Sequence, residues 1–164
     1  MRTLPSSALP SRLPKASRIL VEFSIAAIAS DLSKVMATPD AARWELQIVA
    51  PLEVLASMRS AKDSDELYQA RLLWTIYPDS APSLKFRDPD TGRLDLPTAW
   101  PMVRGFRPGN LDACVNYCSE GLVTHQEWAT DPNYRWDPRG NVLLKVLRIL
   151  QAELDEYYGG RFRG

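Results

Sequence analysis

The chain of 164 residues contains few side chains that build covalent or metal-held scaffolds, with two cysteines and one histidine. Cys114 and Cys118 lie too close together in the sequence to form a disulfide framework, and their spacing is not that of a Cys-x-x-Cys redox pair. This scarcity is typical of a reducing compartment, in which a thiol stays free. With His125 the two cysteines offer three zinc ligands, but no cysteine or histidine remains to complete the site. We therefore expect no metal and no cofactor.

The chain also lacks a charge imbalance and a long hydrophobic run. Lys and Arg total 20, as do Asp and Glu, so no global field attracts nucleic acid. No apolar run reaches the roughly 18 residues that a membrane-spanning helix needs. Pro5, Pro10 and Pro14 interrupt the N-terminal segment, which argues against a secretion signal. We expect a cytoplasmic protein that binds neither nucleic acid nor membrane.

The remaining composition is that of an ordinary globular domain. Apolar residues make up 45% of the chain and charged residues 24%. The length fits one domain with a core of its own. Because Ser, Pro and Leu are mixed near the N-terminus, we predict a flexible arm over residues 1–16 and a single domain over residues 17–164.

The domain is predicted to begin with an α-helix that starts at Ser17 and ends at Thr38-Pro39-Asp40. Apolar residues recur along it at three- to five-residue spacing, which indicates one buried stripe. The stripe consists of Leu20, Phe23, Ala27, Leu32 and Val35.

Four strands are predicted next, because apolar and polar residues alternate with period two. The alternation covers residues 44–48, 52–56, 68–76 and 84–86, with a polar turn over residues 60–65. Sequential strands joined by turns favour an antiparallel meander.

The segment from Arg87 to Asp137 shows little periodicity, although short helical turns are expected near residues 110–119. Structureless loops longer than about 15 residues are uncommon in compact domains unless they are functional, so we look for chemistry here. A last helix is predicted to begin at Asp137-Pro138 by capping. It is predicted to end at Gly159-Gly160, with a short flexible tail after it. The fold class is therefore α+β.

Several pieces of this order also match one known family. Tyr77-Pro78 with Pro82 forms a turn before the short strand Leu84-Lys85-Phe86, and a Gly-containing segment over residues 108–114 leads to Cys114. Trp136-Asp137-Pro138 then precedes the last helix. Over residues 17–158 this combination resembles the ubiquitin-conjugating enzymes. The resemblance implies a UBC-like fold with an N-terminal helix, a four-stranded antiparallel meander, a long active-site loop and a C-terminal crossing helix.

The chain departs from the family at several positions. The family's His-Pro-Asn triplet, whose asparagine supports the oxyanion, is replaced by Trp100-Pro101-Met102. The segments before and after Cys114 are longer than in the family, and the two C-terminal helices of many members are absent. The chain therefore looks like a divergent, bacterial-type member. Such proteins occur beside activating enzymes and ubiquitin-like proteins in bacterial conjugation operons, some of them antiphage.

The resemblance implies a thioester transferase. Cys114 would receive a ubiquitin-like protein from an activating enzyme and pass it to a target amine. Asn110 or Asn116 can replace the missing oxyanion donor, and Asp112 can orient the amine. His125 can reach back as a base or an oxyanion donor.

Less specific interpretations remain open for each of these residues. Cys114 can be a small buried hydrophobe, as most free cysteines are, and we interpret Cys118 in this way. His125 can be a surface loop residue, and Asp112 a solvated turn residue. The whole chain can be a catalytically inactive UBC-like binding or scaffold module, which the missing triplet favours, or an unrelated α+β scaffold.

Overall fold

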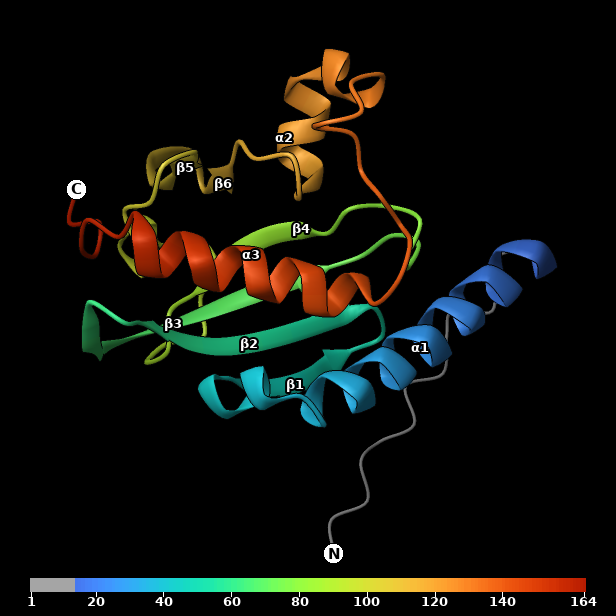
Figure 1. Ribbon diagram of the computed structural model, residues 1–164, viewed down its shortest axis with the longest axis horizontal. Coiled ribbons are helices and arrows are strands. Elements are labelled where there is room, and N and C mark those ends of the chain that lie inside the picture. The colour runs from blue at the N-terminus through green and yellow to red at the C-terminus, as the bar shows by residue number, and fades with distance from the viewer. Residues whose placement is uncertain (1–13) are drawn as a thin grey trace, which may run out of the picture.

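Alternating apolar residues build a central sheet, and a helix lies across one of its faces (Figure 1). The computed structural model describes residues 14–164 of the chain. The main elements are α1 (Lys15–Met36), β1 (Glu45–Ala50), β2 (Glu53–Ser60), β3 (Asp63–Leu73), β4 (Ser83–Arg87) and α3 (Val142–Glu156). Between β4 and α3 lie two short strands and one short α-helix, namely β5 (Phe106–Arg107), β6 (Asp112–Ala113) and α2 (Ser119–Thr124), together with three 3₁₀ turns. The α+β class predicted from the sequence is confirmed.

The sheet is the predicted antiparallel meander, with strand order β1-β2-β3-β4. Ala56 pairs with Ala70, which pairs with Phe86, so residues of one parity share the buried face. The boundaries of β3 differ from the prediction. β3 already begins at Asp63, so the predicted polar turn is reduced to residues 61–62. The strand ends at Leu73, before Trp74.

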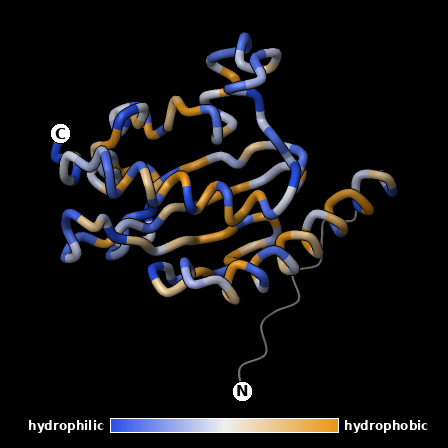
Figure 2. Tube along the Cα trace, viewed as in Figure 1, coloured by the Kyte–Doolittle hydropathy of each residue, from blue (hydrophilic) through white to orange (hydrophobic). Residues whose placement is uncertain are grey.

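The core lies between this sheet and α3, where orange and blue alternate along the helix in Figure 2. Leu143, Leu147 and Leu150 of α3 are at most 1% exposed. The helix starts later than predicted, at Val142. Its N-cap is Asn141, whose side-chain oxygen accepts a hydrogen bond from the amide of Leu144 at 2.9 Å. The predicted start at Asp137-Pro138 was therefore wrong.

α1 packs against α3, and the predicted stripe lies on the packed face only at Ala27, Leu32 and Val35. Its buried residues are Ser24, Ile28 and Val35. Leu20 and Phe23, which were predicted to be buried, are 52% and 71% exposed, so that part of the prediction was wrong. The helix begins at Lys15, inside the predicted arm. The rest of that arm, residues 1–13, lies outside the described residues.

The segment after β4 contains more structure than predicted. β5 and β6 form a two-stranded hairpin, and α2 follows it. The amide of Ser119 donates to the carbonyl of Pro82 at 2.9 Å, which ties α2 to the turn before β4. α2 contacts β4, and the turns that follow α2 form a lobe farther from the sheet, at the top of Figure 1.

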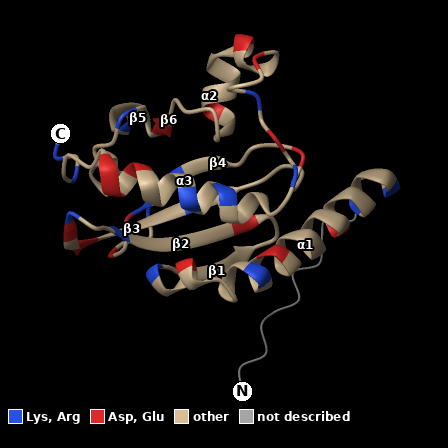
Figure 3. Ribbon diagram, in the orientation of Figure 1, with Lys and Arg blue, Asp and Glu red and all other residues tan. Residues whose placement is uncertain are grey.

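The C-terminal residues are held against the domain, so the predicted flexible tail was wrong. The amide of Met102 donates to the carbonyl of Gly160 at 2.7 Å, and the amide of Phe162 donates to Trp100 at 2.9 Å. The tail thus runs antiparallel to the segment around Pro101. Figure 3 shows acidic and basic residues mixed over most elements. Within residues 14–164, no helix combines the length and apolar character needed to cross a membrane.

Candidate functional site

The β5–β6 hairpin positions Cys114. Phe106 pairs with Ala113, and both are buried, at 8% and 0% exposure. The amide of Cys114 continues the ladder by donating to the carbonyl of Gly105 at 2.7 Å. Because side chains alternate along a strand, Cys114 lies on the face opposite Ala113. Its side chain therefore points away from the Phe106 side of the hairpin.

The two cysteines have different environments. Cys114 is partly exposed, whereas Cys118 is completely buried. Burial, assisted by the charge of Glu120, raises the pKa of Cys118 well above its ordinary value. The interpretation of Cys118 as a core residue is confirmed. Cys114 is thus the thiol with access to solvent.

An ion pair lies beside Cys114. The Nε and Nη2 atoms of Arg107 donate to the two carboxylate oxygens of Asp112 at 2.7 and 2.8 Å. These hydrogen bonds and the negative charge of Asp112 raise the pKa of Arg107. Arg107 and Cys114 share one face of the hairpin as diagonal neighbours. The carboxylate predicted to orient an amine is therefore already paired with a guanidinium.

Sequence reasoning missed Arg107. Arg107 is brought near Cys114 by its pairing with Asp112 in the β5–β6 hairpin. Strands of two residues are too short to show the alternation of apolar and polar residues by which a strand is predicted. The structure places Cys114 on the same hairpin face as this ion pair, in which the carboxylate of Asp112 balances the charge of Arg107.

α2 fixes the backbone directly after Cys114. A Cβ atom on Gly121 would lie 2.1 Å from the carbonyl oxygen of Val115 and 2.5 Å from its nitrogen. Only glycine therefore allows α2 to approach this closely. The side chain of Glu120 also reaches β4, where it accepts hydrogen bonds from the Ser83 hydroxyl and the Leu84 amide. The loop that carries Cys114 is thus clamped between β4 and α2.

His125 lies at the C-terminal end of α2 and makes its contacts within the same lobe. Its Nδ1 is 2.9 Å from a carboxylate oxygen of Glu127, and its ring stacks on Trp128 with centroids 4.2 Å apart. Trp128 in turn stacks on Tyr134. The side chain of Asn116 donates to the carbonyl of Tyr134 at 3.3 Å, which joins this stack to the cysteine loop.

Asn110 ends the short turn over residues 108–110 and is exposed. Its neighbour Leu111 has φ of 57°, a left-handed conformation that turns the chain into β6. The carbonyl of Leu111 accepts a hydrogen bond from Nζ of Lys85 at 3.1 Å. The roles assigned to Asn110, Asp112 and His125 from the sequence remain predictions.

In the Trp100-Pro101-Met102 segment the first two residues are buried, whereas Met102 is 42% exposed. Trp100 is 0% exposed and packs edge-on against Phe86 and Phe106. Its indole Nε1 is buried without a hydrogen-bond partner among the described residues. Met102 is paired with the C-terminal tail through its backbone. This segment therefore stabilises the fold rather than presenting a polar side chain.

Trp136 contacts the Tyr77-Pro78 turn. The indole Nε1 of Trp136 donates to the carbonyl of Pro78 at 3.0 Å, and the Tyr77–Pro78 peptide bond is cis. A groove of about 430 Å³ lies between this turn and α2. Its walls include Leu73, Trp74, Ser80, Leu122, Val123 and Trp136.

Within residues 14–164, no group of three His, Cys, Asp or Glu side chains is placed to hold a metal ion. Comparisons of the chain with protein-family models, with curated proteins and with solved structures give no match. Any function therefore has to be argued from the residues and their arrangement.

Proposed function

We propose that the chain is a divergent ubiquitin-conjugating-like transferase with a UBC-like fold. In this proposal Cys114 carries the C-terminal carboxyl group of a ubiquitin-like protein as a thioester. An activating enzyme supplies that group, and a target amine accepts it. The proposal places the protein in the cytoplasm, where a reducing environment keeps the thiol free.

One observation carries the proposal: of the two thiols, Cys114 alone is partly exposed, on a loop held by β4 and α2 beside the Arg107–Asp112 ion pair. A thioester carrier needs a reachable sulfur on a rigid support, because attack requires a fixed approach. The contact between Trp136 and the Tyr77-Pro78 turn adds support, since these segments carry the resemblance.

The chemistry proceeds in two balanced steps. Sγ of Cys114, as a thiolate, attacks the carbonyl carbon of the incoming thioester, and the cysteine of the activating enzyme leaves as a thiolate. A target amine then attacks the new thioester and loses a proton, while Cys114 leaves as a thiolate.

A second function is favoured by a specific observation. The family's oxyanion donor is missing, and Trp100 in the corresponding segment is buried in the core. Losing one such donor costs roughly a hundredfold or more in rate. A catalytically inactive binding module on the same fold is therefore the alternative.

The test mixes the chain with a ubiquitin-like protein, its activating enzyme and ATP, followed by a non-reducing gel. We expect an adduct that reductant removes. Cys114→Ala should abolish it, and Cys114→Ser should give an ester that survives reductant.

Cys118→Ala is the matched control and should still form the adduct. An adduct that persists in Cys114→Ala, or that is lost only in Cys118→Ala, would show that the proposed site is wrong. Binding of the ubiquitin-like protein without any adduct would support the inactive module.

A further inference from the structure

α1 carries two apolar stripes, of which the domain covers only one. Ile28 and Val35, at 1% and 0% exposure, face the domain. On the other side, Ile19, Leu20 and Phe23 are 42%, 52% and 71% exposed. The N-terminal part of α1 extends beyond the sheet in Figure 1, and Figure 2 shows hydrophobic residues along it.

The exposed stripe follows a heptad pattern. Its members alternate three- and four-residue steps, as the a and d positions of a coiled coil do. They are Ala16, Ile19, Phe23, Ala26 and Ser30, and four of them are small or aliphatic. Ile28 and Val35 occupy the f position of the same heptads, so the stripe points away from the domain. A partner helix can therefore lie along the stripe without touching the sheet.

We propose that the exposed stripe of α1 pairs with the same stripe of a second copy of this chain, in an antiparallel arrangement. A crossing near residue 21 places Ile19 of each copy against Phe23 of the other. The small side chain of Ala16 then faces Ala26, and Leu20 lies beside its symmetry mate. The surface is self-complementary, as a two-fold interface requires.

Charge complementarity favours this arrangement. Arg18 and Glu22 lie one turn apart on the same flank of the stripe. The antiparallel crossing brings Arg18 of each copy next to Glu22 of the other, twice in the pair. The two Arg18 side chains also reduce the electrostatic repulsion between the two Glu22 side chains. In a parallel pair, Arg18 of one copy and Glu22 of the other would instead lie at different heights along the helix axis.

The interface covers only about two heptads, so we expect a weak dimer with a dissociation constant on the order of 10–100 µM. This inference goes beyond the proposed transferase function, and Cys114 takes no part in it. The two can therefore fail independently.

Sedimentation velocity on the full chain over a concentration series tests the proposal. We expect the wild type to shift from monomer to dimer, and Phe23→Asp to raise the dissociation constant at least about tenfold. Val123→Asp is the matched control, because Val123 is 73% exposed on α2, and should dimerise like the wild type. Circular dichroism checks that each variant is folded.

A charge swap tests the register. Arg18→Glu should weaken the dimer, and the double variant Arg18→Glu with Glu22→Arg should restore it. In a Cys114→Ala, Cys118→Ala background, Leu20→Cys should form a disulfide-linked dimer on mild oxidation, and Val123→Cys should not.

A chain that stays monomeric at millimolar concentration would overturn the proposal. So would a Phe23→Asp variant that dimerises normally. Phe23-dependent sedimentation with phosphatidylserine vesicles by a monomeric chain would show that the stripe faces lipid instead. Phe23-dependent binding to a different protein by a monomeric chain would also contradict it.

Discussion

At the scale of single residues, the environment of each cysteine decides its chemistry. Cys118 is the N-cap residue of α2 and is buried in the core, where burial raises its pKa. Cys114 lies on the hairpin face shared with Arg107 and is partly exposed. A thiol has to be accessible to solvent to react quickly with thiol reagents.

We therefore predict that one thiol per folded chain reacts with 5,5′-dithiobis(2-nitrobenzoate) and that both react in urea. Cys114→Ser should abolish the reaction of the folded chain, whereas Cys118→Ser should leave it intact. Absorbance of the released thiolate gives the stoichiometry. Fast reaction at Cys118 in the folded chain would contradict the burial of that sulfur.

Tyr77 is the residue that joins α1, the turn before β4 and α3. Its hydroxyl donates to Asp31 of α1 at 2.5 Å and accepts from the amide of Leu143 at 3.3 Å. Ser24 bonds the backbone of Tyr77 as well. Burial, followed by the hydrogen bond to Asp31, raises the pKa of Tyr77 far above its ordinary value.

Tyr77→Phe removes this hydroxyl, so the carboxylate of Asp31 and the amide of Leu143 each lose a hydrogen-bond partner. We predict that the free energy of unfolding falls by about 1–3 kcal/mol. Urea titration followed by tryptophan fluorescence measures the change. Tyr134→Phe is the control, because Tyr134 is 47% exposed, and it should change stability by less than about 0.5 kcal/mol.

At the scale of elements, Asp155 connects α3 to both ends of the β1–β2 region. Arg43, just before β1, donates to its carboxylate at 2.6 and 2.9 Å, and the amide of Ala61 donates at 2.8 Å. Partial burial alone raises the pKa of Asp155, but these hydrogen bonds and one from Gln151 outweigh it and leave the pKa lowered.

This cluster predicts a pH-dependent contribution to stability. Because the folded-state pKa of Asp155 lies below its ordinary value, its contribution is present above about pH 4 and is lost as the pH falls further. Asp155→Asn should lower the free energy of unfolding at pH 7 by about 1–2 kcal/mol, with a smaller difference at pH 3. Urea titrations at both pH values measure it.

Asp95→Asn serves as the control for this experiment. Asp95 pairs with Arg93 two residues away, and its side chain is 66% exposed. An exposed local pair of this kind contributes little, so we expect almost no change at pH 7. An equal loss in both variants would show that the Asp155 contacts do not stabilise the fold.

The sequence predicted those elements that have a clear local period. Alternation in β2 and β3 identified the sheet, because one face is buried against α3. The packed face of α1 was predictable only in part, since Phe23 and Ile28 belong to two apolar stripes and only tertiary contacts select one. The start of α3 was ambiguous for a similar reason. Asp137 and Asn141 are both good N-caps, and Asp137 is instead engaged by Arg139.

The candidate site was predictable only in part. The position of Cys114 in a long loop indicated a functional sulfur, and the structure leaves it partly exposed. The Arg107–Asp112 pair and the close approach of Gly121 to Val115 depend on the path of the chain between distant residues. No local pattern carries that information, so these features came from the structure.

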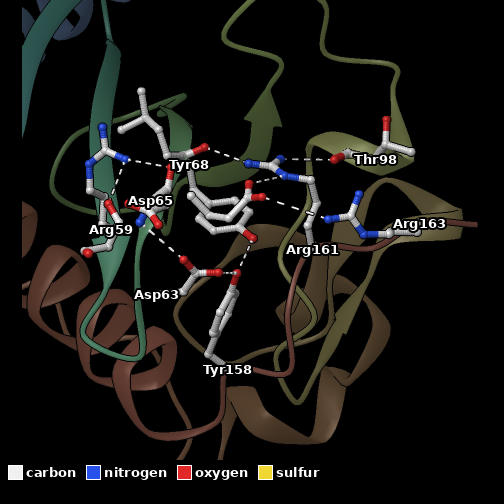
Figure 4. Close-up of polar contacts among 11 residues, drawn as sticks. Arg59, Asp63, Asp65, Tyr68, Thr98, Tyr158, Arg161 and Arg163 are labelled. Carbon is white, nitrogen blue, oxygen red and sulfur yellow. Dashed lines mark hydrogen bonds and ion pairs between the residues drawn. The ribbon is translucent and has the colours of Figure 1, made fainter.

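At the scale of the whole molecule, the C-terminal tail closes the chain onto its own sheet. Figure 4 shows Arg161 extending from the tail between Tyr68 of β3 and Thr98. Its guanidinium donates to Glu66 at 2.7 Å and to the carbonyls of Thr98 and Leu67 at 3.1 and 2.9 Å. It also lies 4.4 Å from the ring centroid of Tyr68. Through Arg161 and its backbone hydrogen bonds, the tail is bound to residues 98–102, which precede the β5–β6 hairpin.

Arg161→Met should therefore loosen the molecule at two places at once. The side chain of Arg161 is 16% exposed and that of Glu66 is 31% exposed, so we predict a loss of about 2 kcal/mol in the free energy of unfolding. Faster hydrogen exchange is expected at the amides of Met102 and Phe162, which bond across the tail.

Arg163→Met is the matched control, because the side chain of Arg163 is 79% exposed and makes only a long contact of 4.0 Å with the same Glu66. It removes the same charge from the same tail without removing the bonds to Thr98 and Leu67. We expect less than about 0.5 kcal/mol of change and unaltered exchange at Met102. Equal effects of the two substitutions would mean that net charge, rather than the buried contacts of Arg161, holds the tail against the sheet.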